Sequence, residues 1–182
     1  SQNSLNNNIF IEKSLKSSKC TYNHKKISKK SLMLSYPCYS LVFGFNNILL
    51  NDSAYRRDFL DSGMFHVEHD SQKLLLSFTK SLKQRNFLLK SKNNSDINFW
   101  SEELINSNLL LHNARLHYFD LLNKEFIAIL ESLKLDMPEI YDEISSIELI
   151  YAKGWEGNYE DQLNSNLIKD TSLGFTSIGT HR

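Results

Sequence analysis

The stretch DSQKLLLSFTKSLKQRNFLLK (residues 70–90), followed by KNNSD (92–96), decides the architecture of the chain. Apolar residues in the first segment recur every three or four positions, which predicts an amphipathic helix. The short polar connection is typical of an antiparallel helix pair. In residues 97–134 the apolar positions approach a heptad rhythm, which predicts a second and longer helix. Together the three segments predict a long antiparallel helical hairpin.

Short strands are expected before this hairpin. Residues 9–11 and 20–22 flank a turn rich in lysine and serine, and residues 36–43 are dense in aromatic and β-favouring side chains. The last two of these segments are separated by four lysines: Lys25, Lys26, Lys29 and Lys30. From residue 53 the period becomes helical, and we expect Ser53 to cap a short helix that Gly63 ends.

The pattern returns to strands after the long helix, which Pro138 closes. Alternation at 147–151 predicts a strand, residues 158–168 a short helix and residues 173–178 a final strand. We therefore expect an α+β fold, in which a small, mainly antiparallel β-sheet portion carries a long antiparallel helical hairpin as an arm. Its expected parts are a strand-rich part of a lobe (1–52), the helical arm (53–137) and a strand–helix–strand return segment (138–182).

Composition excludes several classes of protein. The chain has 182 residues, of which 41% are hydrophobic, which is enough to bury a core and excludes wholesale disorder. No window approaches 18 consecutive apolar residues, and the first residues lack the features of a signal peptide. Cys20 and Cys38 are too few for a disulfide framework, so we expect a cytoplasmic protein. Because no long apolar window is present, we expect no membrane partner.

Charge is divided unequally along the chain. Residues 1–95 carry 15 Lys and Arg against 6 Asp and Glu, whereas residues 96–182 carry 6 against 15. This asymmetry favours a basic surface that contacts a polyanion, although ordinary solvated surface is an equal alternative. The side chains expected to bind DNA phosphates are Arg56, Arg57, Lys80, Lys83 and Arg85. Pairing of the arginines with Asp58, Asp61 or other acids is the alternative interpretation.

Motifs of catalytic chemistry are missing from the sequence. It contains no GxxxxGK[ST] or GxGxxG phosphate loop, no GxSxG elbow and no CxxC pair. His66 and His69 resemble part of a metal site, but a zinc pair on a helix needs spacing i, i+4, and no third ligand is near. We therefore expect no catalytic residue and no metal site, and rank a metal-dependent hydrolase third among the possible functions.

A series of dispersed motifs resembles a known family. They are YRRDFLD (55–61) with Gly63, FHVE (65–68), LKQRN (82–86), Trp100 with Leu104, Arg115 with Tyr118, KGW (153–155) and the D…GxT…GTHR segment (170–182). In this order and spacing they resemble the RecF family of bacterial recombination mediators, ATPases related to the SMC proteins, over about residues 9–182. The sequence departs from the family pattern at Thr180, where proline is usual, and at Tyr39, where a glutamine is expected.

The resemblance implies an ATP-dependent DNA-binding protein. It implies roles in DNA repair, DNA replication, recombination at replication gaps and the SOS response, with ATP and Mg as cofactors of the intact protein. The implied partners are double-stranded or gapped DNA, RecR with RecO and RecA, which is loaded, and a second copy in an ATP-dependent homodimer. The family pattern also places His181 and Arg182 near the nucleotide.

The family's three ATPase motifs do not occur in this chain. The family has its Walker A loop before the matched region, and its signature and Walker B motifs after it. We therefore expect the central part of a slow DNA-dependent ATPase, which by itself is inactive and holds no cofactor. The alternative is a non-enzymatic helical module that binds a partner protein through the heptad-like helix at 97–134. Steeply salt-dependent DNA binding distinguishes the two.

Overall fold

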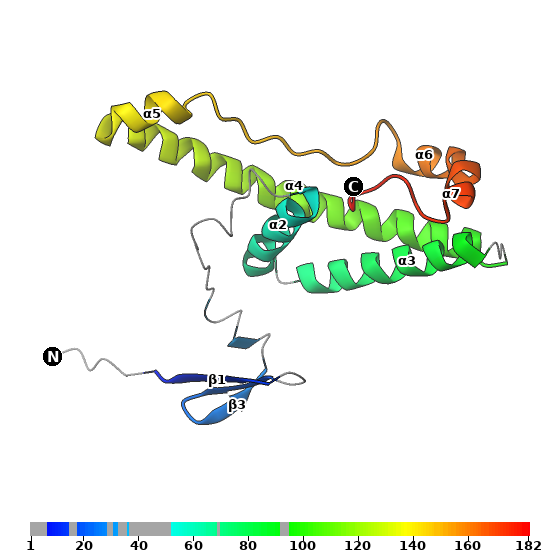
Figure 1. Ribbon diagram of the computed structural model, residues 1–182, viewed down its shortest axis with the longest axis horizontal. Coiled ribbons are helices and arrows are strands. Elements are labelled where there is room, and N and C mark those ends of the chain that lie inside the picture. Colours follow the sequence, from blue (N-terminus) through cyan, green and yellow to red (C-terminus); the bar gives the residue numbers. More distant parts are fainter. Residues whose placement is uncertain are drawn as a thin grey trace. The chain divides into compact units, whose positions relative to one another are not determined.

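The fold combines a small sheet with a helical hairpin. The computed structural model describes residues 7–14, 18–28, 31, 32, 36, 52–68, 70–91 and 95–182. They belong to two compact units, residues 1–47 and residues 48–182 (Figure 1). The first unit contains the described strands and the second contains the long helices. This is the α+β fold that the sequence predicts.

Three antiparallel strands form the described sheet, in the order β1 (Ile9–Lys13), β2 (Ser18–Tyr22) and β3 (Lys25–Ile27). Cys20 at the centre of β2 pairs with Ile11 on one side and with Ile27 on the other. Asn23 and His24 join β2 to β3 with φ values of 47° and 64°. Two consecutive positive φ values are the geometry of the tight hairpin turn that matches strand twist.

The strands predicted at 9–11 and 20–22 are confirmed. The lysine-rich segment was expected only to separate strands, and this prediction is wrong at its start, since residues 25–27 form β3. The reason is the Asn23–His24 turn, which reverses the chain directly after β2. The strand predicted at 36–43 lies, apart from Tyr36, outside the described residues.

The predicted helical hairpin is confirmed. Its two helices are α3 (Ser71–Ser91) and α4 (Ile97–Asp136), and α3 lies along the first half of α4 (Figure 1). The hydroxyl groups of Ser81 and Ser107 are hydrogen-bonded at 2.8 Å across the pair. Because an α-helix rises 1.5 Å per residue, the 40 residues of α4 extend over about 60 Å.

The preceding helix, α2 (Ser53–Val67), differs from its prediction at both ends. Asp52 is the N-cap in place of Ser53, and its Oδ1 accepts a hydrogen bond of 2.9 Å from the amide of Tyr55. Gly63 lies inside the helix and does not end it. A Cβ atom at Gly63 would overlap the hydroxyl of Tyr118 on α4, so the absence of a side chain here permits the close approach of the two helices.

The return segment, which the structure describes throughout, contains three short helices and neither of the strands predicted for it. It contains α5 (Pro138–Ile144), α6 (Tyr159–Ser165) and α7 (Leu167–Leu173). The helix predicted at 158–168 is therefore found as two short helices. The strand predicted at 147–151 is not formed, because this segment runs along α4 and no described strand pairs with it (Figure 1).

The final strand, predicted at 173–178, is also wrong. Gly174 ends α7 with a φ of 73°, and the amides of residues 176 and 177 bond to side chains instead of a neighbouring strand. Thr176 N donates to Asn86 Oδ1 at 2.8 Å, and Ser177 N donates to Asp170 Oδ1 at 3.0 Å. The division of the chain at residues 52 and 137 stays a prediction.

The largest core cluster lies where α2, α3, α4 and α6 meet. Its buried members are Met64, Phe78, Leu104, Ile105, Leu111, Trp155, Tyr159, Leu163 and Ile178. Leu111 is fully buried, as the hairpin prediction requires, and Leu82 packs against the cluster while partly buried. Among the described residues, no helix combines the length and the apolar character needed to cross a membrane.

Leu111→Ala should lower the free energy of unfolding by about 2–5 kcal/mol, because it removes a fully buried side chain and leaves a cavity. Leu110→Ala is the matched control, since its side chain is 55% exposed on the same helix, and it should change stability by about 0.5 kcal/mol or less. Urea denaturation measures both. Equal losses in the two variants would show that α4 is packed in a different register.

Candidate functional site

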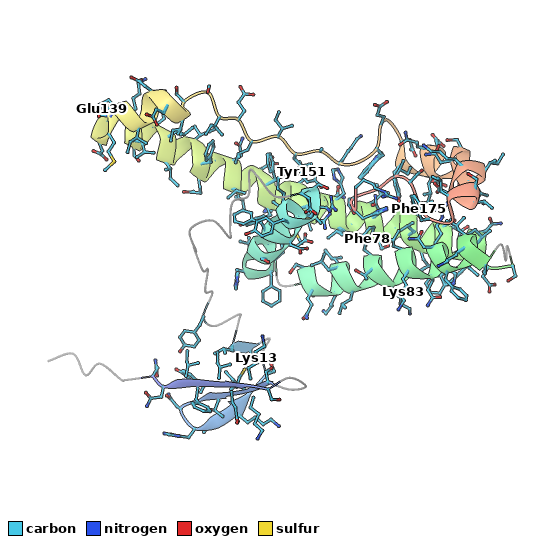
Figure 2. The ribbon with its side chains drawn as sticks, in the orientation of Figure 1. Lys13, Phe78, Lys83, Glu139, Tyr151 and Phe175 are labelled. Atoms are coloured by element: carbon cyan, nitrogen blue, oxygen red, sulfur yellow. The ribbon has the colours of Figure 1, made fainter. Side chains whose placement is uncertain are left out.

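Lys80 and Lys83 are exposed on α3, as expected from the sequence, and Figure 2 shows Lys83 on this helix. The ammonium group of Lys80 lies 5.8 Å from the centre of the Trp100 ring on α4. This contact holds a cation over an aromatic face and favours its position slightly. Both ammonium groups are available to a phosphate backbone.

Arg85 was expected to share this exposed surface, and this placement is wrong. Its side chain is fully buried, and Nη1 donates to Asp170 Oδ2 at 2.8 Å and to Thr176 Oγ1 at 2.7 Å. Nε donates to Ser101 Oγ at 3.1 Å. A buried guanidinium needs an anionic partner, and Asp170 supplies it from α7. Arg85 therefore has a structural role in this fold.

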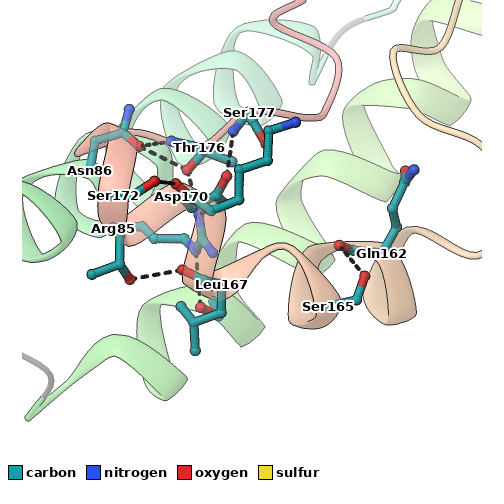
Figure 3. A network of polar contacts seen from close by, with 12 residues as sticks. Arg85, Asn86, Gln162, Ser165, Leu167, Asp170, Ser172, Thr176 and Ser177 are labelled. Carbon is teal, nitrogen blue, oxygen red and sulfur yellow. Dashed lines mark hydrogen bonds and ion pairs between the residues drawn. The ribbon is translucent and has the colours of Figure 1, made fainter.

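A polar network extends from this ion pair (Figure 3). The hydroxyl of Thr176 accepts from Arg85 and donates to Asn86 Oδ1 at 2.8 Å. The second carboxylate oxygen of Asp170 accepts the amide of Ser177. Since Asp170 and Thr176 are both fully buried, these bonds fix the segment that follows α7 against α3.

A second buried arginine binds the end of the same segment. Arg115 on α4 contacts Asp61 through two parallel bonds, Nε to Oδ1 at 2.7 Å and Nη2 to Oδ2 at 2.8 Å. Its Nη1 donates to the carbonyl of Thr180 at 2.7 Å, while Thr180 N donates to Asn108 Oδ1 at 2.9 Å. This fork couples α2, α4 and the segment ending at residue 182.

Arg56 and Arg57 lie on α2, where Arg56 is exposed and Arg57 is half-buried. Nη1 of Arg57 is buried and has no hydrogen-bond partner among the described residues. Arg182 donates from Nη2 to the carbonyl of Thr176 at 2.6 Å, and its guanidinium carbon lies 4.8 Å from the centre of the Phe175 ring. Arg56, Arg57 and Arg182 all line one pocket beside α2.

The imidazole of His181 lies next to these cations. Burial lowers the pKa of His181 to about 4, and the positive charges of Arg182 and Arg57 act in the same direction. The imidazole is therefore neutral at pH 7. Its Nε2 lies 3.2 Å from the carbonyl of Thr176, which can only accept, so Nε2 carries the proton.

The histidine pair considered as a metal site is only half described. His66 packs edge-on against Phe65, with ring centres 5.4 Å apart, and His69 lies outside the described residues. Within the part of the chain that the structure describes, no three His, Cys, Asp or Glu side chains gather as a metal site would require. His112 is a packing residue, stacked on Tyr151 with ring centres 5.6 Å apart.

The sequence led us to name Asp61 only as a possible partner of Arg56 and Arg57. It did not lead us to Asp170 as the partner of Arg85, nor to Asn86 and Asn108 as acceptors for the segment that ends at residue 182. A signal was present, because three of these residues, Asp61, Asn86 and Asp170, belong to the motifs that resemble a known family.

Asp170→Asn should lower the free energy of unfolding by about 3–5 kcal/mol, because it leaves the guanidinium of Arg85 buried without an anion. The double variant Arg85→Met with Asp170→Leu should lose less than the sum of its single changes. Lys73→Met removes the exposed pair with Asp70 and is the control, with a much smaller effect. Urea denaturation checks these values, and additive losses would contradict the pairing.

The free energy of unfolding should fall as the pH drops from about 6.5 to about 4. In this window the unfolded chain protonates the imidazole of residue 181, whereas the folded chain, in which the pKa of His181 is lowered, does not. His181→Gln should reduce this pH dependence, because it removes the group whose pKa is lowered by folding. Urea denaturation at pH 7, 5.5 and 4.5 measures it, and an unchanged pH profile in His181→Gln would contradict the assignment.

Comparison with known proteins identifies relatives of the chain, although no family model matches it. It is 35% identical over 149 residues to the DNA replication and repair protein RecF of Pseudoalteromonas translucida, a match over 79% of this chain and 37% of that protein. It is 27% identical over 179 residues to the protein of the same name from Leptospira interrogans, covering 95% of this chain and 47% of that protein.

The fold agrees with these matches. A solved structure of the recombination mediator protein RecF with ATPrS, in the RecFOR pathway, superposes with a TM-score of 0.72 at 18% identity, over 96% of this chain and 49% of that one. A RecF–ATP structure superposes with a TM-score of 0.70. The chain therefore spans less than half the length of these proteins. Over that length it is a relative of RecF, in sequence and in fold.

Proposed function

We propose that the chain is a DNA-binding part of a RecF-like protein that acts in DNA replication and repair. The observation that carries this proposal is the 35% identity over 149 residues to a RecF protein. The excess of basic residues in the first 95 positions supports it, because binding to a polyanion depends first on phosphate neutralisation. We extend the proposal to recombination at gaps and to the SOS response.

Four side chains form the basic surface through which this part would bind DNA: Arg56, Arg57, Lys80 and Lys83. The two lysines are exposed on α3, and the two arginines lie on α2. Cations of this kind contact phosphates without reading sequence, which suits a protein that recognises a gapped or double-stranded structure. Arg85 is left out, because its guanidinium is occupied by Asp170.

ATP and Mg belong to the proposal only for a longer protein. The sequence lacks a GxxxxGK[ST] loop, and the two residues expected near the nucleotide are already engaged within the chain. His181 is neutral at pH 7 and bonded to Thr176, while Arg182 donates to the same carbonyl. These residues do not form a nucleotide site by themselves. ATP-driven homodimerisation, partnership with RecR, RecO and RecA, and a cytoplasmic location are likewise proposals for the longer protein.

A helical module that binds a protein partner is the second candidate. It is favoured by large apolar side chains that remain exposed in the second half of α4 and at its end. Leu135 is 85% exposed, and Ile127, Ile129 and Met137 are each more than half exposed. Exposed apolar side chains that gather in one region often mark an interaction surface.

Replacing Lys80 and Lys83 by Gln should weaken binding to a gapped duplex and flatten its salt dependence. Each lost phosphate contact should reduce the slope of log affinity against log salt by about 0.9, so the double variant should lose about 1.8. Fluorescence anisotropy at two salt concentrations measures affinity and slope.

The matched control replaces Lys124 and Lys169 by Gln. These two lysines are also exposed but lie outside the basic surface. It makes the same change in net charge. Equal affinities and slopes for the two double variants would show that only the overall charge matters, and would remove the basic surface from the proposal.

A further inference from the structure

A pocket of about 490 Å³ lies between α2, the second half of α4 and the extended residues 149–152. Its walls are mainly apolar, with Phe59 from α2 and with Phe119 and Phe126 from α4. The whole pocket belongs to the second compact unit. A volume of this size accommodates a small ligand or a few large side chains of a partner.

Positive charge surrounds this apolar pocket. Arg56, Arg57 and Arg182 contribute to its lining, against one acidic residue, Glu125. Nη1 of Arg57 is a buried donor without a partner among the described residues, and such a donor is costly unless an acceptor reaches it. The occupant that fits this pocket is therefore apolar and anionic.

The third wall of the pocket is extended backbone. Residues 147–151 alternate as a strand does, and Ile150 is 82% exposed, yet no described strand pairs with them. Tyr151 is held from behind, because its ring stacks on His112 and lies 5.6 Å from the centre of the Phe119 ring (Figure 2). An extended edge of this kind is a template for pairing with another extended segment.

We propose that this pocket docks an extended peptide segment of another protein, in which carboxylates alternate with large apolar side chains. The backbone of the peptide pairs with residues 149–152, its apolar side chains enter the pocket, and a carboxylate accepts from Arg57. This role needs no DNA, and the pocket shares Arg56 and Arg57, but not Lys80 and Lys83, with the basic surface.

A nucleotide is also anionic, but it fits this pocket less well than an acidic peptide does. The walls offer aromatic and aliphatic carbon, and the polar edge of a base would lose its hydrogen bonds to water without gaining others. Leucine and phenylalanine side chains carry no such cost. We therefore treat nucleotide binding as the outcome that would replace the proposal.

The test uses the whole 182-residue chain and a fluorescein-labelled octapeptide, Glu-Leu-Asp-Phe-Glu-Leu-Asp-Phe. The control peptide has Gln and Asn in place of Glu and Asp, so that only the charge differs. Fluorescence anisotropy should show saturable binding of the acidic peptide and binding at least about tenfold weaker for its amide counterpart. Hydrogen exchange at residues 149–152 should slow when the acidic peptide is bound, because its backbone covers this edge.

Two variants locate the binding. Ile129→Glu adds a negative charge at the pocket and should weaken the acidic peptide at least about tenfold, as should Arg57→Gln. Ile127→Glu is the matched control, since Ile127 is on the same helix, similarly exposed at 52% against 57%, and does not line the pocket. Circular dichroism confirms that each variant is folded.

Three results would overturn the proposal. They are equal affinity for the two peptides, equal weakening by Ile129→Glu and Ile127→Glu, and displacement of the peptide by thymidine 5′-monophosphate. The Lys80→Gln/Lys83→Gln variant separates this inference from DNA binding, because it should bind the acidic peptide unchanged whether or not DNA affinity is lost.

Discussion

The buried ion pair between Arg85 and Asp170 is the constraint on which the second unit depends. A guanidinium inside a protein is tolerated only where an anion and further acceptors surround it. Arg85 on α3 can therefore be buried only if α7 delivers Asp170 to it, 85 residues later in the chain. Thr176 takes the same Nη1 group, so the segment after α7 has to follow. The fork between Arg115 and Asp61 fixes α2 in the same way.

The sequence predicts best those elements whose formation depends on nearby residues. The helical hairpin at 70–134 follows from periodicity and a polar turn, and the structure agrees within two residues at each end. A β-strand forms only where another strand pairs with it, and for this reason the alternation at 147–151 was not sufficient to predict one. The burial of Arg85 could not be read from its own helix, where periodicity puts it at the side, because its partner is remote in sequence.

The proposed DNA contact and the proposed peptide pocket share Arg56 and Arg57. The lysines of the basic surface lie on α3, whereas the pocket is bounded by α2 and α4. A carboxylate held by Arg57 would neutralise a cation that could otherwise contact a phosphate. A partner in the pocket and a DNA strand along α2 would therefore compete for the same positive charge, and an acidic partner would favour the release of DNA.

The seven buried residues of α4 all lie between Ile97 and Arg115, and none lies in the remaining half of the helix. The first half of α4 is therefore held by its packing in the core, whereas the second half has no buried residue to hold it. Beyond Arg115 the helix extends for about 30 Å, so a tilt of about 10° at Arg115 would displace the end of the helix by about 5 Å. Small adjustments around Leu104 and Leu111 are thereby magnified at Leu135. The packed half of α4 sets the direction of the helix, and this direction determines where the end of its second half lies.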